Sequence, residues 1–233
     1  PCSLERDYLK KILAGCVKHA GLDDAYVEMI QTRGVSKNFQ RDPRKANHRF
    51  IAFAVPFGWI LNPDEFEKGL NVIVSNIRRI PPESVDSKIK NYHWLDLISG
   101  MFEAYDSNVD SVILVDEGNN ISEGPGFNIF CVDASGLNTP DKGVLEGVTR
   151  QTVLDLAEEI KLPVNLKPIS IDMLNDSIEV FATSTAGGIM PITKINNQLV
   201  GNGTPGKVTR QMHKSYWDLH VNSRWTQSVN DLV

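Results

Sequence analysis

Three segments that lie far apart in the chain carry side chains that could act together in one reaction. Residues 90–94 begin with the amine of Lys90, residues 123–129 begin with the carboxylate of Glu123, and residues 184–191 begin with two hydroxyls, those of Ser184 and Thr185, before a Gly-Gly pair. A lysine can form a Schiff base with an aldehyde, a carboxylate can keep a pyridine nitrogen protonated, and hydroxyls beside free backbone N–H groups can bind phosphate. The three segments together predict a site for a phosphorylated pyridine aldehyde.

A fourth segment, residues 147–153, adds to this prediction. Gly147 precedes a helical pattern that begins at Val148 and Thr149. The first N–H groups of a helix have no intrahelical acceptor and lie at the positive end of the helix dipole, so they suit a phosphate. Thr149 also has a simpler explanation, as a residue that caps the helix.

The other candidates likewise have ordinary structural explanations. Lys90 could be a surface lysine, Glu123 an acidic residue of a turn, and residues 184–188 a plain strand-to-loop turn. The neighbours of Lys90 favour the chemical interpretation, because the side chains of Tyr92 and Trp94 predict an apolar surrounding. Such a surrounding disfavours the ammonium form and makes the amine more nucleophilic.

The elements that would position these residues follow from the spacing of the apolar side chains. Helical spacing predicts helices over residues 4–19, 93–105, 149–160 and 206–219. Runs rich in Val, Ile and Phe predict strands near 25–32, 49–56, 71–77, 111–116, 127–132, 163–169, 178–183 and 192–195. Strands and helices do not alternate strictly, which favours a mixed α+β fold.

A Pro-Pro pair at residues 81–82 predicts the domain organisation, because two prolines end a helix or a strand. We expect residues 1–79 to form a smaller N-terminal α/β subdomain, 80–89 a linker and 90–233 a larger C-terminal subdomain that binds the cofactor.

Composition excludes several classes of function. The chain has 233 residues, a formal net charge of −5, 41% hydrophobic and 23% charged residues, and no basic stripe suited to nucleic acid. No apolar run is long enough for a bilayer, and the beginning of the chain lacks a signal-peptide pattern. The three cysteines, Cys2, Cys16 and Cys131, have no metal-binding spacing and are expected to be buried free thiols. We therefore expect a cytoplasmic protein without a metal site, a nucleic-acid partner or a membrane partner.

Four ordered motifs carry a resemblance to a known family. They are residues 78–82 leading into 89–94, then 123–129, 139–150 and 185–193. The chain resembles the fold-type IV enzymes that depend on pyridoxal 5′-phosphate (PLP), which include branched-chain and D-amino acid aminotransferases and aminodeoxychorismate lyase. Within that group it is most similar to the fungal (R)-selective amine transaminases. The resemblance implies the two-subdomain α+β fold of D-amino acid aminotransferase.

The resemblance also implies roles for individual residues. Lys90 corresponds to the catalytic Schiff-base lysine and Glu123 to the partner of the pyridine nitrogen. The phosphate-binding turn corresponds to Val148 and Thr149, and the hydroxyl pair near phosphate and substrate to Ser184 and Thr185. Substrate-binding positions correspond to Phe39, Arg41, Trp94, Thr185 and Ala186, with Phe39 standing where the family has a carboxylate-binding arginine and Arg41 as its substitute.

The implied activity is transamination between an (R)-amine or D-amino acid and a keto acid or ketone, by a homodimer. The alternatives are a branched-chain aminotransferase, a lyase of the same fold, or a truncated inactive homologue. The last arises because family members carry a further N-terminal segment, with an arginine for the cofactor phosphate, before the helix expected here at residue 4.

Overall fold

The computed structural model describes residues 4–233 and divides the chain into two units, one of residues 1–58 with 222–233 and one of residues 59–221. The linker expected at 80–89 lies inside the larger unit. The strand before it, β3 (Leu70–Arg78), pairs in parallel with β4 (Ser111–Val115) and with β9 (Gly188–Ile195). The boundary therefore falls before β3 rather than after it, because sheet hydrogen bonds, and not the proline pair, decide which unit a strand joins.

The smaller unit contains the first helix and a two-stranded antiparallel sheet. Helix α1 (Arg6–Ala20) ends at Gly21, whose φ of 65° is the left-handed conformation that glycine adopts at helix ends. Strands β1 (Ala25–Ser36) and β2 (Ala46–Pro56) pair with Ile30 opposite Ile51. The helix and both strands expected in this region are confirmed, and the polar segment between the strands forms two short 3₁₀ turns.

The larger unit is built on a mixed sheet with the strand order β4-β3-β9-β8-β5-β6-β7, and β10 (Gln198–Leu199) pairs with β9. Its remaining strands are β5 (Asn128–Asp133), β6 (Gly136–Thr139), β7 (Val164–Leu166) and β8 (Glu179–Ser184). The pairs β5–β8, β8–β9 and β5–β6 are antiparallel, whereas β6–β7 is parallel. The α+β class is thus confirmed.

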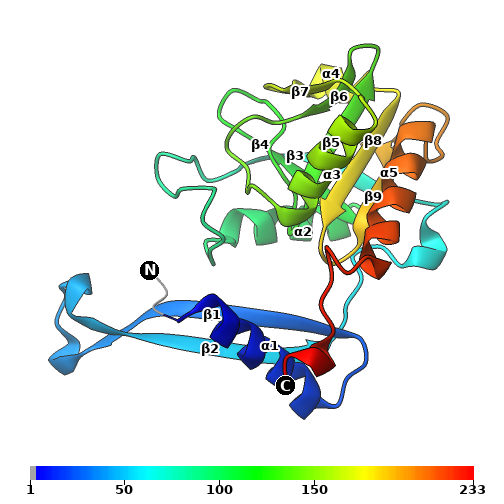
Figure 1. Ribbon diagram of the computed structural model, residues 1–233. Coiled ribbons are helices and arrows are strands. Elements are labelled where there is room, and N and C mark those ends of the chain that lie inside the picture. The colour runs from blue at the N-terminus through cyan, green and yellow to red at the C-terminus, as the bar shows by residue number, and fades with distance from the viewer. Residues whose placement is uncertain (1–3) are drawn as a thin grey trace. The chain divides into compact units, whose positions relative to one another are not determined.

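Helices cover this sheet. They are α2 (Leu95–Asp106), α3 (Val148–Glu159), α4 (Ile171–Asn175) and α5 (Lys207–Asp218). In Figure 1, α3 and α5 lie side by side across β5, β8 and β9. The rings of Phe130 and Phe181 stack beneath them at 5.2 Å in one core cluster, and a second cluster fills the other face of the sheet.

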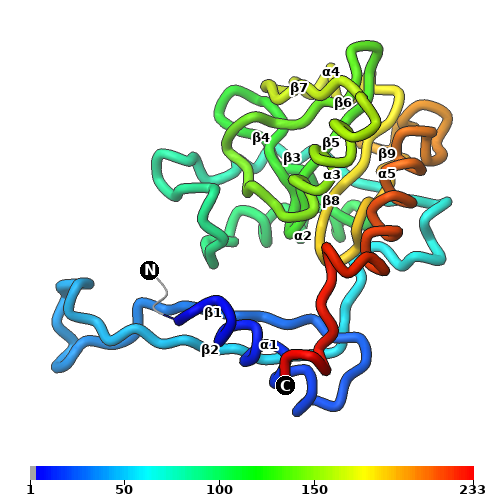
Figure 2. The backbone as a smooth tube through the Cα atoms, in the orientation of Figure 1, coloured from blue at the N-terminus to red at the C-terminus, as the bar shows by residue number. Residues whose placement is uncertain are grey.

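Buried polar contacts fix where helices begin. The Glu179 carboxylate accepts hydrogen bonds from the backbone N–H groups of Val208 at 3.0 Å and Thr209 at 2.7 Å, which fastens the start of α5 to β8. The segment between β3 and α2 contains no helix or strand, and Figure 2 shows it in teal, running outside the sheet.

The differences from the expected elements are local. The sequence analysis did not predict β6, α4 or β10, and β9 begins at Gly188 instead of residue 192. Cys131 is buried, and burial raises the pKa of its thiol to about 11. Cys16 is only half-buried, contrary to the prediction, and Cys2 lies outside the described residues. Over residues 4–233, no helix has the length and apolar character needed to cross a membrane.

Candidate active site

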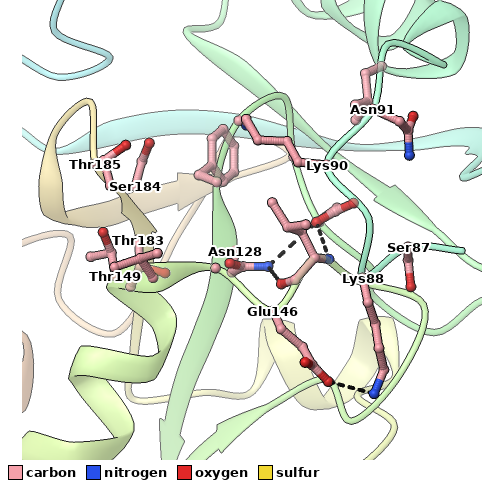
Figure 3. Close-up of a pocket in the computed structure, with 18 of the residues that line it drawn as sticks. Ser87, Lys88, Lys90, Asn91, Asn128, Glu146, Thr149, Thr183, Ser184 and Thr185 are labelled. Carbon is pink, nitrogen blue, oxygen red and sulfur yellow. Dashed lines mark hydrogen bonds and ion pairs between the residues drawn. The ribbon is translucent and has the colours of Figure 1, made fainter. Parts of the chain in front are cut away.

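A cavity of about 350 Å³ opens in the larger unit, and the segments singled out from the sequence meet around it. Its walls come from the stretch between β3 and α2, the turn before β5, the start of α3 and the end of β8. Figure 3 shows Lys90, Asn128, Thr149, Ser184 and Thr185 around this space. The cofactor-binding residues predicted from the sequence all line it: Lys90, Glu123, Val148, Thr149, Ser184 and Thr185.

Lys90 does not have the apolar surrounding that its neighbours predicted. Its side chain is exposed, and so are Ile89 and Tyr92, with 63% and 69% of their surface accessible. The prediction failed because apolar neighbours in the sequence do not by themselves bury a residue, and the segment that carries Lys90 belongs to no helix or strand. The side chain nevertheless extends toward the part of the cavity where Ser184 and Thr185 lie (Figure 3).

Glu123 is buried at the cavity wall, with 6% of its surface exposed. Its Oε1 accepts from Arg79 Nε at 3.1 Å, and its Oε2 accepts from the Leu145 N–H at 2.9 Å and from Asn128 Nδ2 at 3.5 Å. Burial raises the pKa of Glu123, and the Leu145 N–H and the Arg79 guanidinium offset only part of that rise. The carboxylate is therefore fixed in place, and its protonation is poised to respond to a further charge.

Two charged residues here had no role assigned from the sequence: Arg79, which lines the cavity, and Asp96, which lies behind it. Arg79 is 8% exposed, and its Nη1 donates to Asp96 Oδ2 at 2.7 Å while its Nε reaches Glu123. Arg79 directly follows β3 and lies two residues before Pro81, within the motif of residues 78–82. Its place in that motif was the available signal.

The start of α3 provides a site for an anion. Gly147 is the N-cap and has no side chain to occupy the first N–H groups of the helix. Its place is crowded, because a Cβ there would lie 2.3 Å from Asn128 Oδ1. Asn128 in turn donates through Nδ2 to the Leu145 carbonyl at 2.8 Å. A glycine is required here so that the backbone can approach the cavity closely.

Two hydroxyls beside this helix start are buried without a hydrogen-bond partner among the described residues. They belong to Thr149 and Thr183, each 2% exposed, and both residues line the cavity. Burial raises the pKa of Tyr216, and the nearby Thr149 hydroxyl offsets part of the rise, although the two groups do not meet in ordinary hydrogen-bond geometry. Because an unpaired buried hydroxyl is costly, these groups point to a missing polar ligand. Thr183 was not predicted.

The predicted substrate-binding residues divide between the two units. Trp94 and Thr185 line the cavity, whereas Ala186 does not; its carbonyl accepts a hydrogen bond from the Ile60 N–H at 2.9 Å. The described residues that line the cavity all belong to the larger unit. Phe39, which is 88% exposed, and Arg41 lie on the β1–β2 connection of the smaller unit, so their substrate-binding roles stay predictions.

Comparison with known proteins shows the family of this chain. Residues 1–195 match the sequence profile of the family described as amino-transferase class IV. The chain belongs to this family. Class IV aminotransferases use PLP, and this protein is accordingly a PLP-dependent aminotransferase.

Several relatives within the family are similar over most of the chain. A protein of Methanocaldococcus jannaschii named putative branched-chain-amino-acid aminotransferase is 29% identical over 98% of this chain and 78% of its own length. The branched-chain-amino-acid aminotransferase of Escherichia coli is 27% identical over 99% of this chain and 77% of its own. A crystal structure of the E. coli enzyme superposes with a TM-score of 0.89 at 26% identity, covering 99% of this chain and 78% of that one.

The residues around the cavity fit PLP on the observations already given. The chain offers Lys90 for the aldehyde, the buried carboxylate of Glu123 for the ring nitrogen, and the uncapped start of α3 for the phosphate. The unpaired hydroxyls of Thr149 and Thr183 supply further donors beside that helix. A buried carboxylate, an amine unpaired among the described residues and an anion site in a single cavity match the three polar parts of the cofactor.

Proposed function

We propose that the chain catalyses transamination with Lys90 as the catalytic residue. When bound, PLP supplies the electron sink that makes the substrate C–H bond acidic. Lys90 Nζ would hold the cofactor aldehyde and, when displaced by the substrate amine, would act as the base that removes the proton from the substrate carbon and as the acid that delivers it to the former aldehyde carbon. Glu123 holds the ring nitrogen in its protonated form, and the N–H groups of Val148 and Thr149 hold the phosphate.

The proposed substrate class rests on one observation: of the described residues that line the cavity, the arginine and one of the two lysines are already paired with carboxylates. Arg79 is bound by Glu123 and Asp96, and Lys88 Nζ lies 2.7 Å from Glu146 Oε1. Lys90 is assigned to the aldehyde. Among the described residues that line the cavity, no further lysine or arginine remains for a substrate carboxylate. The cavity lining therefore favours an amine donor without a carboxylate. We propose the (R) configuration for that donor because the motifs at residues 78–94 and 185–193 resemble those of the (R)-selective amine transaminases. A D-amino acid belongs to the same proposal, but its carboxylate would need a cation from outside these lining residues.

Branched-chain amino acids are the second candidate substrates. The names of the similar proteins from M. jannaschii and E. coli favour them, since both are called branched-chain-amino-acid aminotransferases. For such a substrate, and for a keto-acid acceptor, the carboxylate would need a cation such as Arg41 of the smaller unit. One charge-assisted hydrogen bond from such a cation to the substrate carboxylate would contribute about 1.5–3 kcal/mol to the free energy of substrate binding.

Two further properties belong to this proposal. We propose a homodimer, because the family resemblance places active sites near a subunit interface, and a cytoplasmic location, because the cysteines are not arranged for disulfides or metal. Sedimentation as a monomer that still binds PLP would contradict the dimer.

The proposed function is tested by spectra and then by substrates. Purified protein with added PLP should show an absorption band that borohydride removes, and Lys90→Ala should lack it. Both enantiomers of a benzylic amine and both enantiomers of leucine are then offered with pyruvate as acceptor and, in a separate series, with a ketone that has no carboxylate. Turnover of the (R)-amine supports the first candidate and turnover of L-leucine alone the second, whereas a protein that never shows the band contradicts the transaminase proposal.

A further inference from the structure

A chain of three charged groups leads from the half-buried Asp96 through the buried Arg79 to Glu123 at the cavity wall. Asp96 Oδ2 accepts from Arg79 Nη1 at 2.7 Å, and Arg79 Nε donates to Glu123 Oε1 at 3.1 Å. The side chains of the three residues are 14%, 9% and 8% exposed respectively. The guanidinium is planar and its N–H donors have fixed directions. A contact with one carboxylate therefore fixes the direction in which the guanidinium donates to the other.

Asp96 is the fixed end of this chain. It lies in the first turn of α2, where its Oδ1 accepts from the Leu97 N–H at 2.8 Å and its Oδ2 accepts from the Ile80 N–H at 2.7 Å. These contacts tie the carboxylate to the start of a helix and to the backbone that follows Arg79. Arg79 is therefore anchored from behind, on the side away from the cavity.

Glu123 is the end of the chain that faces the cavity. The two carboxylates and one guanidinium carry a net charge of −1 when both acids are ionised. One more cation next to Glu123 would bring the sum to zero. A protonated pyridine nitrogen is such a cation. Arg79 is itself a cation without an acceptor atom, and Asp96 is not among the residues that line the cavity, so of these three groups Glu123 is the one that can accept from it.

We propose that Arg79, anchored by Asp96, is a positioning residue that keeps the Glu123 carboxylate ionised and in one orientation for the ring nitrogen of PLP. This inference rests on the proposed role of Glu123. Without Arg79, a carboxylate this deeply buried takes up a proton of its own, and the ring nitrogen then loses the charge that it needs as an electron sink.

The experiment measures the protonation of the ring nitrogen directly. PLP labelled with nitrogen-15 at that atom is bound to the full chain, and its resonance is recorded for wild type, Arg79→Met, Arg79→Lys, Glu123→Gln and the double variant Arg79→Met/Glu123→Gln. The dissociation constant of PLP is measured for each. Arg78→Met is the matched control, since Arg78 is the neighbouring arginine, is exposed, and donates to the Asp116 carbonyl outside the cavity.

We expect Arg79→Met and Arg79→Lys to move the resonance toward that of neutral pyridine and to weaken PLP binding by roughly ten- to a hundredfold, as when a partner behind a ligand is removed. Lysine keeps the charge but cannot reach two carboxylates at once, so this variant tests the inference even where methionine prevents folding. In the Glu123→Gln background, the Arg79 substitution should have no further effect on the resonance.

Two results would overturn the inference, and they are distinguishable. A wild-type resonance and affinity in both Arg79 variants, with a shifted resonance in Glu123→Gln, would reject the role of Arg79 and leave the role of Glu123 standing. A wild-type resonance in Glu123→Gln would reject the proposed partner of the ring nitrogen, and the inference with it.

Discussion

The backbone N–H of Leu145 donates a hydrogen bond to Glu123 Oε2 at 2.9 Å, across 22 residues of sequence. Leu145 stands two residues before Gly147, the N-cap of α3. The carboxylate proposed for the ring nitrogen and the helix start proposed for the phosphate are thus joined by one bond. A shift of either group would strain this hydrogen bond, so the positions of the two ends of the proposed cofactor site are coupled.

Replacing Lys90 should abolish catalysis without harming the fold. Lys90→Ala is expected to lower transamination by roughly a thousandfold or more, because both the Schiff base and the proton transfer use its amine. The side chain is exposed, so the unfolding midpoint should not change. Lys88→Ala is the control: its ion pair with Glu146 is exposed, and the variant should keep the spectrum of the wild type. Full activity of Lys90→Ala would contradict the mechanism.

The two acids on Arg79 should titrate with opposite effects on stability. Burial raises the pKa of Glu123 above 4.5, so between the unfolded and the folded pKa the folded state binds more protons than the unfolded state. The free energy of unfolding therefore falls as pH rises from 4.5 through the folded pKa. The pKa of Asp96 is lowered below 3.8. Burial alone would raise it, but this effect is outweighed by hydrogen bonds from the Ile80 N–H, Arg79 and the Leu97 N–H. Its contribution is present above that value and is lost as pH falls through the folded pKa.

Urea unfolding without PLP, at a series of pH values, measures both effects. Glu123→Gln should remove the decline on the side above pH 4.5, and Asp96→Asn should remove the loss at acidic pH. Identical pH profiles for wild type and Glu123→Gln would show that this carboxylate does not titrate as its burial implies.

Removing the Thr183 hydroxyl should stabilise the PLP-free protein and at the same time weaken PLP binding. Its buried hydroxyl has no partner, so Thr183→Val is expected to raise the free energy of unfolding of the PLP-free protein by about 1 kcal/mol. The same variant should bind PLP more weakly. Thr139→Val is the matched control, because the Thr139 hydroxyl donates to the Ile129 carbonyl at 2.7 Å. That variant should instead lose about 1 kcal/mol. Unchanged PLP affinity in Thr183→Val would exclude its hydroxyl as a ligand.

Gly147 should tolerate no side chain. The added Cβ of Gly147→Ala would lie 2.3 Å from Asn128 Oδ1 and force Asn128 or the start of α3 to move. We expect a loss of about 1–3 kcal/mol in the free energy of unfolding, as for other overpacked sites, and weaker PLP binding. Gly15→Ala provides the contrast: its Cβ would meet nothing within 4 Å in α1, so it should gain about 0.5–1 kcal/mol. Calorimetry and PLP titration check both.

The sequence by itself determined most of the elements and the chemical types at the site. Local spacing was sufficient for α1, α3, α5 and the central strands, because an apolar face has a period that is legible along the chain. Lys90, Glu123, Thr149 and Ser184 could be named as candidates because a phosphate, a ring nitrogen and an aldehyde each require a particular kind of side chain.

Only the tertiary structure decided how these groups are partnered. Arg79 contacts Glu123 across 44 residues, and no local pattern carries such a pairing. Burial was decided in the same way: Lys90 is exposed although its neighbours are apolar, and Thr183 is buried without a partner although threonine is an ordinary strand residue. Both outcomes depend on which distant segments cover a residue. In the same way, β3 belongs to the larger unit because it is hydrogen-bonded to β4 and β9, which lie later in the chain.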